Sequence, residues 1–185
     1  MPVFSLAWRT RKGSGPQHDA VVQGHTSPQP EARKWIILAR HSGPFHLHSG
    51  LTSQAVASPR ALLCALAPEA CLCVSLDPVN MTLTCSVTAR ADGGPPLHYF
   101  RLADGRVRPL LPDPESLTFS AGDTYVALCL GARRVTDSPS VARFLHERDD
   151  FNADKLAASL LDHLLELAGS EALAEDITAL VVEAR

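Results

Sequence analysis

The sequence lacks the features that would place the protein in a membrane or on a nucleic acid. No stretch approaches the roughly 20 apolar residues that a membrane-spanning helix requires, and the apolar run in residues 1–9 is too short for a secretory signal peptide. An excess of one charge is also missing, because 17 Lys and Arg residues oppose 20 Asp and Glu residues, for a formal net charge of −3. The basic residues are scattered, so we expect neither nucleic acid nor a membrane surface as a partner.

The cysteine count excludes a framework in which every thiol is paired, because the chain has five cysteines. Most of them lie in apolar, strand-like segments, where a free thiol behaves as a small hydrophobic group. Cys71 and Cys73 would share one strand face, but no second Cys or His pair stands at the spacing of a zinc site. The cysteines therefore indicate core positions and a reducing compartment, and we expect a cytoplasmic protein.

The composition is that of an ordinary globular protein, with 45% apolar and 20% charged residues. A chain of 185 residues has the size of one domain, so we expect a single domain over residues 1–185. Short apolar or alternating runs bounded by turn residues predict strands at residues 20–22, 35–39, 71–76, 82–88, 97–102, 106–110, 124–129 and 177–182. The four runs between residues 71 and 110 are expected to form one antiparallel meander.

Three segments are predicted as helices. The strongest spans residues 153–168, where leucines recur at helical spacing and Gly169 follows as a stop. A second begins at Pro139, with Ser138 as the expected cap, and a weak helical pattern runs from residue 52 to residue 66. Strands and helices do not alternate as they would in a parallel sheet, so the predicted class is α+β.

Several short motifs resemble, in order, those of the metal-dependent protein phosphatase superfamily, the type 2C serine/threonine phosphatases. Residues 175–178 read Glu-Asp-Ile-Thr and resemble the Asp-Asn-Ile-Thr strand that ends these domains. Residues 122–131 are similar to the family's Gly-Asp, apolar strand, Ser-Asp-Gly segment. Residues 17–20 are similar to its Asn-Glu-Asp motif, and residues 35–53 to its Val-Ala-Asp-Gly-Met-Gly-Gly-His segment. The resemblance implies a four-layer α-β-β-α sandwich of two antiparallel sheets, with a two-metal site at one edge.

The resemblance also implies carboxylates that hold the two metal ions, and this chain keeps only some of them. Asp19 retains the carboxylate of Asn-Glu-Asp, and Glu175 replaces the aspartate of the final strand. Arg40 stands at the aspartate of Asp-Gly-Met-Gly-Gly, and Leu130 at that of Ser-Asp-Gly. Asp92 is read as the remnant of a Gly-Asp-Ser motif. These five positions therefore describe a degenerate site, for which we expect no bound metal and no catalytic residue.

Arg40 is the substitution with the largest expected effect. A fixed positive charge about 4 Å from a divalent cation costs about 8 kcal/mol at an effective dielectric constant of about 20. Two carboxylates brought together without a counter-charge would also raise one another's pKa, and a guanidinium removes that conflict. We therefore expect Arg40 to pair with Asp19 or Glu175 in place of the missing metal.

Three functions remain open from the sequence. The first is a catalytically inactive phosphatase-fold protein, or pseudophosphatase, that acts as a regulatory or protein-binding module without a cofactor. Its protein partner is expected to be a kinase, a phosphoprotein or part of a larger assembly. The second is a divergent metal-dependent serine/threonine phosphatase, whose altered site binds Mn or Mg through Asp19, Glu175 and Asp92.

The third function is a phosphoprotein-binding reader. The family's phosphate-binding arginine falls at Ser14, so Arg40 is the candidate phosphate ligand, with Arg11 or Lys12 as further candidates after a small shift of the alignment. A guanidinium can grip a phosphate through two parallel hydrogen bonds without hydrolysing it.

Overall fold

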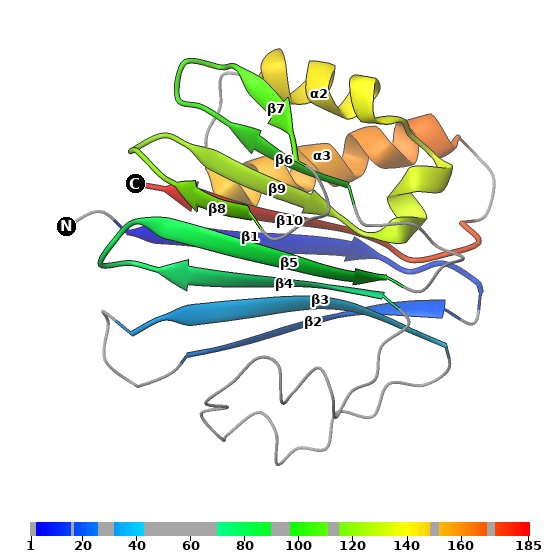
Figure 1. Cartoon of the computed structure of the whole chain (residues 1–185). Helices are drawn as coiled ribbons and strands as arrows, with labels where there is room; N and C mark the ends of the chain where they lie inside the picture. Colours follow the sequence, from blue (N-terminus) through cyan, green and yellow to red (C-terminus); the bar gives the residue numbers. More distant parts are fainter. Residues whose placement is uncertain are drawn as a thin grey trace.

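The computed structural model describes residues 3–15, 17–25, 32–42, 70–89, 97–110, 115–148, 152–169 and 173–185. Their strands form two antiparallel five-stranded sheets (Figure 1). In spatial order, sheet A consists of β1 (Phe4–Arg11), β10 (Ile177–Ala184), β9 (Thr124–Leu128), β6 (Leu97–Arg101) and β7 (Val107–Pro109). Sheet B consists of β2 (Gln17–His25), β3 (Lys34–Ser42), β4 (Ala70–Asp77), β5 (Thr82–Ala89) and β8 (Glu115–Thr118).

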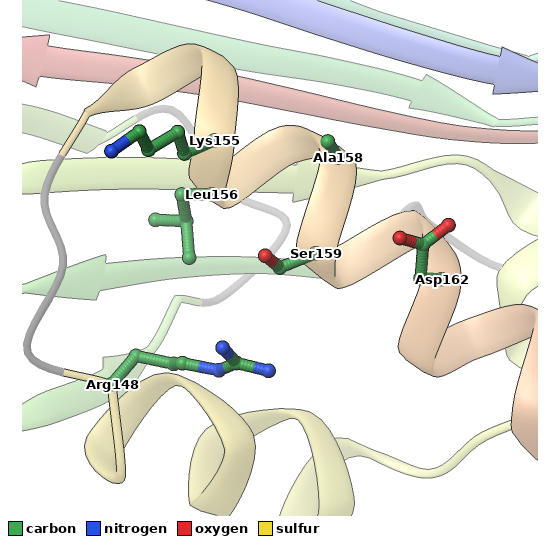
Figure 2. A pocket seen from close by; sticks show the side chains of 6 residues that line it. All are labelled: Arg148, Lys155, Leu156, Ala158, Ser159 and Asp162. Atoms are coloured by element: carbon green, nitrogen blue, oxygen red, sulfur yellow. The ribbon is translucent and has the colours of Figure 1, made fainter.

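Two α-helices cover the face of sheet A that points away from sheet B (Figure 1). They are α2 (Ser138–His146) and α3 (Ala153–Ala168), and a short 3-10 helix, η1 (Leu130–Arg134), follows β9. The Asn152 side chain caps α3 by accepting a hydrogen bond from the Asp154 backbone N–H, and Gly169 ends the helix with a φ of 71°. A groove separates the end of α2 from α3 (Figure 2). No described helix is long and apolar enough to cross a membrane.

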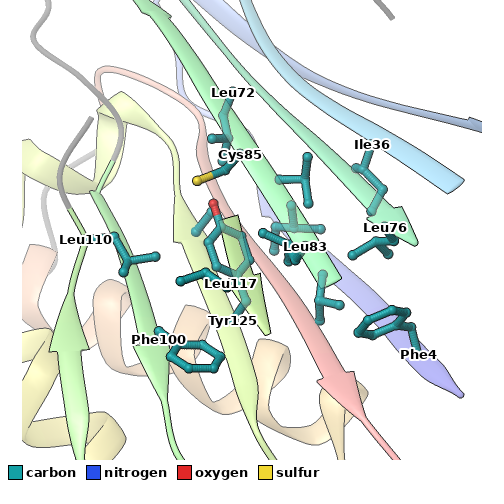
Figure 3. Packing of buried hydrophobic residues seen from close by; sticks show 14 of the residues in the cluster. Phe4, Ile36, Leu72, Leu76, Leu83, Cys85, Phe100, Leu110, Leu117 and Tyr125 are labelled. Carbon is teal, nitrogen blue, oxygen red and sulfur yellow. The ribbon is translucent and has the colours of Figure 1, made fainter. Parts of the chain in front are cut away.

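The main core lies between the two sheets (Figure 3). Leu83 of sheet B and Tyr125 of sheet A are fully buried there. Phe119 meets Phe4 and Phe100 edge to face, with ring centroids 5.3 and 5.0 Å away. A second core joins sheet A to the helices, so every residue of β10 is buried. Strands covered on both faces lose polar alternation, which explains the continuous apolar run at the end of the sequence.

The α+β class with two antiparallel sheets is confirmed. The helix expected from residue 52 to residue 66, which would supply the fourth layer of the sandwich, falls outside the described residues. Cys73, Cys85 and Cys129 are buried, as their apolar surroundings indicated. Helix α3 has the predicted bounds.

Three local predictions were wrong. The runs between residues 71 and 110 form two hairpins in different sheets, β4 with β5 and β6 with β7, instead of one meander. Strands β1 and β8 were missed, because one mixes polar and apolar residues and the other has only four residues. Asp137, and not Ser138, caps α2 by accepting a hydrogen bond from the Ser140 backbone N–H at 2.8 Å.

Candidate functional site

The motif residues meet at one edge of the sandwich, where β10 begins. Asp19 of β2 and Arg40 of β3 are directly opposite each other in the antiparallel register. Glu175 and Asp176 immediately precede β10, which lies between β1 and β9 in sheet A. The short connection from β1 to β2 brings the two sheets together here, so residues from both ends of the chain share one site.

Glycines allow the backbone before β10 to pack tightly into this edge. A Cβ on Gly13 would stand 2.4 Å from the Glu175 carbonyl carbon, and a Cβ on Gly131 would stand 2.0 Å from the Asp176 carbonyl oxygen. Gly15 also donates a backbone hydrogen bond of 2.9 Å to the Ala174 carbonyl. No larger residue fits at Gly13 or Gly131 without moving the backbone, so these glycines hold the carboxylates of this segment in place.

Glu175 is bound by two guanidinium groups. Its side chain is only 7% exposed, and Arg40 pairs with its Oε2 atom. Arg134 of η1 pairs with Oε1 at 2.7 Å. The two arginines differ in environment, because the Arg40 side chain is 10% exposed and that of Arg134 is 69% exposed. The expected pairing of Arg40 with Glu175 is thus confirmed, and both oxygens of the carboxylate are occupied.

Asp19 is buried beside this ion pair. The Thr178 hydroxyl donates to its Oδ2 atom at 2.8 Å, and the Cys129 thiol, which donates to the Asp176 carbonyl at 3.3 Å, lies beside the carboxylate. Burial raises the pKa of Asp19 above its usual 3.8, and the thiol, the hydroxyl and the Arg40 charge offset the shift only in part. The same burial, with the Asp19 charge beside it, raises the pKa of the Cys129 thiol well above its usual value. Asp19 is therefore an acid that the protein disfavours in its charged form.

Asp176 has a structural role that the sequence analysis missed. Its Oδ2 atom accepts hydrogen bonds from the Lys12 ammonium at 2.7 Å and from the Asp19 backbone N–H at 3.0 Å, and its Oδ1 atom accepts one from the Gly13 N–H at 2.8 Å. Burial alone would raise the pKa of Asp176, but these donors outweigh it and hold the pKa below 3.8. Asp176 therefore ties the β1–β2 connection to the start of β10.

The remaining predicted positions are spread around the edge. Leu130 is the first residue of η1, and Asp92 lies outside the described residues. Ser14 donates its hydroxyl to the Leu173 carbonyl at 3.1 Å, while Arg11 is exposed at the end of β1. In the described part of the chain, no group of three or more His, Cys, Asp or Glu side chains is placed to hold a metal ion.

Arg134, Thr178 and Cys129 also belong to the site but were not singled out from the sequence. Thr178 lies within the Glu-Asp-Ile-Thr motif, so its place in the motif could have indicated that it belongs to the site. Nothing in the local pattern of η1 indicated that Arg134 would reach Glu175, because that contact depends on how η1 packs against β10.

No protein-family model and no curated protein matches the chain. Several solved structures, however, match the chain over nearly its whole length. The phosphatase domain of the cell fate determinant SpoIIE from Bacillus subtilis has a TM-score of 0.68 and 11% identity, over 99% of this chain and 92% of that one. This chain has the fold of PP2C-type phosphatase domains.

Two further PP2C-fold matches agree over nearly the whole chain. The SiaA PP2C domain of Pseudomonas aeruginosa has a TM-score of 0.64 and 16% identity, and the match covers 97% of this chain and 85% of that one. RsbX, solved in complex with magnesium, has a TM-score of 0.63 and 10% identity, over 98% and 96% of the two chains. The chain therefore shares the PP2C fold with these two proteins although its sequence identity to them is only 16% and 10%.

Proposed function

We propose that this protein is a pseudophosphatase: a PP2C-fold chain that does not hydrolyse phosphate esters and acts by binding a protein partner, such as a kinase or a phosphoprotein. The observation that carries the proposal is the buried ion pair between Arg40 and Glu175. It stands where the PP2C motifs predict a metal-binding edge.

A divalent cation does not fit the residues that line this edge. Magnesium, with which the fold relative RsbX was solved, takes oxygen ligands and is usually held in proteins by one or two carboxylates together with several waters. Glu175 has both oxygens on guanidinium groups, and a cation would have to approach Arg40 to reach it. Asp19 offers a carboxylate whose charge is already disfavoured by burial. Leu130 has no oxygen in its side chain.

The poor fit of a cation to these residues bears directly on catalysis in this fold class. Two-metal hydrolysis requires cations that activate a water and stabilise the charge on the transferred phosphoryl group. A site whose carboxylates are neutralised by arginine, or pushed toward the protonated form, supports neither step. A divergent phosphatase that works through Asp19, Glu175 and Asp92 would first have to displace Arg40.

A phosphate reader that uses Arg40 is less well supported than a pseudophosphatase. The Arg40 side chain is only 10% exposed and already satisfies Glu175, so an incoming phosphate would have to break a buried pair. Of the two further candidate phosphate ligands, Lys12 binds Asp176 and Arg11 is exposed at the end of β1.

The test is hydrolysis of para-nitrophenyl phosphate by the full chain in magnesium and in manganese, alongside an Asp19→Ala variant. We expect no turnover above the variant's background, and no saturable manganese binding by calorimetry. Metal-dependent turnover that Asp19→Ala abolishes would refute the proposal in favour of the divergent enzyme. Binding of a phosphoserine peptide that is lost in Arg40→Met would instead favour the reader.

A further inference from the structure

A second polar site lies in the groove between the end of α2 and α3, on the face of sheet A that carries the helices. Its lining consists of Arg148, Lys155, Leu156, Ala158, Ser159 and Asp162, around a cavity of about 240 Å³. Figure 2 shows the Arg148 guanidinium reaching along the groove below α3, with Lys155 toward one end and Asp162 toward the other. None of these residues belongs to the phosphatase motifs.

The polar side chains of this groove have no partners within the described protein. Arg148, Lys155, Ser159 and Asp162 make no side-chain hydrogen bond or ion pair there, whereas exposed residues nearby, such as Arg9 with Asp154, do pair. The Arg148 guanidinium is nevertheless oriented, because it stacks on the Phe144 ring with its carbon 4.7 Å from the ring centroid.

The Phe144 ring that carries this arginine is itself held in place. It is buried, and it stacks on His163 of α3 with centroids 4.5 Å apart and an interplanar angle of 15°. An arginine fixed on an aromatic platform loses less conformational entropy when it binds, which favours a recognition role.

The charges define the class of group that fits. Arg148 and Lys155 contribute two positive charges and Asp162 one negative charge, so the lining carries one net positive charge. A carboxylate matches this charge and can accept two parallel hydrogen bonds from Arg148. A doubly charged phosphate would meet the Asp162 carboxylate at the far end of the groove.

The size of the groove points to a side chain and not to a free ligand. Small-molecule sites enclose about 300–1,000 Å³ and bury most of their ligand. This groove is smaller, and Arg148, Lys155 and Asp162 are all exposed at its rim. We propose that it is the docking site for an Asp or Glu side chain presented by the protein partner, an inference that rests on the protein-binding function proposed above.

The test is a titration of the 15N-labelled full chain with the peptide acetyl-Gly-Ala-Glu-Ala-Gly-amide, followed by NMR. We expect saturable shifts confined to the amides of residues 143–148 and 152–163, and none with the same peptide carrying Gln in place of Glu. Arg148→Glu should weaken binding by about tenfold or more, since a charge-assisted hydrogen bond is lost.

Arg143→Glu is the matched control, because it makes the same charge change at an exposed position of α2 outside the groove. It should leave the affinity almost unchanged. Lys155→Gln, which leaves the Phe144 stack intact, should weaken binding by about threefold.

Three results would overturn the assignment: no localised shifts, equal weakening by Arg143→Glu and Arg148→Glu, or tighter binding of free glutarate or of the phosphoserine version of the peptide. Glutarate would identify a small dicarboxylate as the occupant, and phosphoserine a phosphorylated segment. Each result would leave the pseudophosphatase proposal intact, because its test measures hydrolysis and metal binding at the edge where β10 begins.

Discussion

Replacing Arg40 with methionine should destabilise the protein far more than replacing Arg134, although both guanidinium groups bind the same Glu175 carboxylate. The difference lies in their environments, with side-chain exposures of 10% and 69%. Methionine preserves much of the apolar stem of arginine, so packing changes little in either variant. The comparison therefore isolates the effect of burial on one ion-paired charge.

The size of the effect follows from the carboxylate that is left behind. Removing one partner of a buried ion pair costs about 3–5 kcal/mol, because the other charge stays buried without compensation. In Arg40→Met the exposed Arg134 still binds one oxygen of Glu175, so we expect a loss of about 2–3 kcal/mol, at or just below the lower bound of that range. Arg134→Met should cost less than about 1 kcal/mol, as exposed pairs do.

Urea unfolding followed by tryptophan fluorescence measures both losses, since Trp35 is buried in the same strand as Arg40. A loss of about 2 kcal/mol in a chain of this size lowers Tm by roughly 4–8 °C. The double variant Arg40→Met with Glu175→Gln should be more stable than Arg40→Met alone, because it removes the charge left without its buried partner. Equal losses for Arg40→Met and Arg134→Met, or no recovery in the double variant, would refute the assignment of Arg40 as the buried counter-charge.

Three further predictions concern the same edge. Arg40→Asp combined with Leu130→Asp should create divalent-cation binding detectable by calorimetry, and a folded double variant without it would contradict the assignment of these two positions to the metal site. Because burial raises the folded-state pKa of Asp19 above 3.8, the folded chain holds this proton to higher pH than the unfolded chain, so the free energy of unfolding should fall as pH rises through that window. Asp19→Asn should flatten this fall in urea titrations at pH 4.5 and 7, whereas an unchanged slope would assign the titration to another group. Gly131→Ala should cost about 1–3 kcal/mol or more in thermal unfolding, because the new Cβ would stand 2.0 Å from the Asp176 carbonyl oxygen.

Much of the secondary structure could be predicted because it is encoded locally. Helix α3 has a leucine stripe at helical spacing and a glycine directly after its last turn, and its bounds were predicted correctly. Strand β9 is an apolar run after a turn, and the structure buries every residue in it. The short strand β8 carries no such pattern, so only its pairing with β5 reveals it. The division of the hairpins between two sheets could not be predicted from the sequence either, because local alternation does not indicate which sheet a strand joins.

The candidate site divides in the same way. The sequence by itself determined the order of the motifs, the loss of a carboxylate at Arg40 and at Leu130, and the expectation that Arg40 would find a carboxylate. Only the tertiary structure decided that this carboxylate is Glu175 and that Arg134 of η1 also binds it. The same is true of the hydrogen bond from the Gly13 N–H to Asp176. The physical reason is that ion pairs and hydrogen bonds depend on distances of a few ångströms between segments that are far apart in sequence, and only the packing of β10 between β1 and β9 sets those distances.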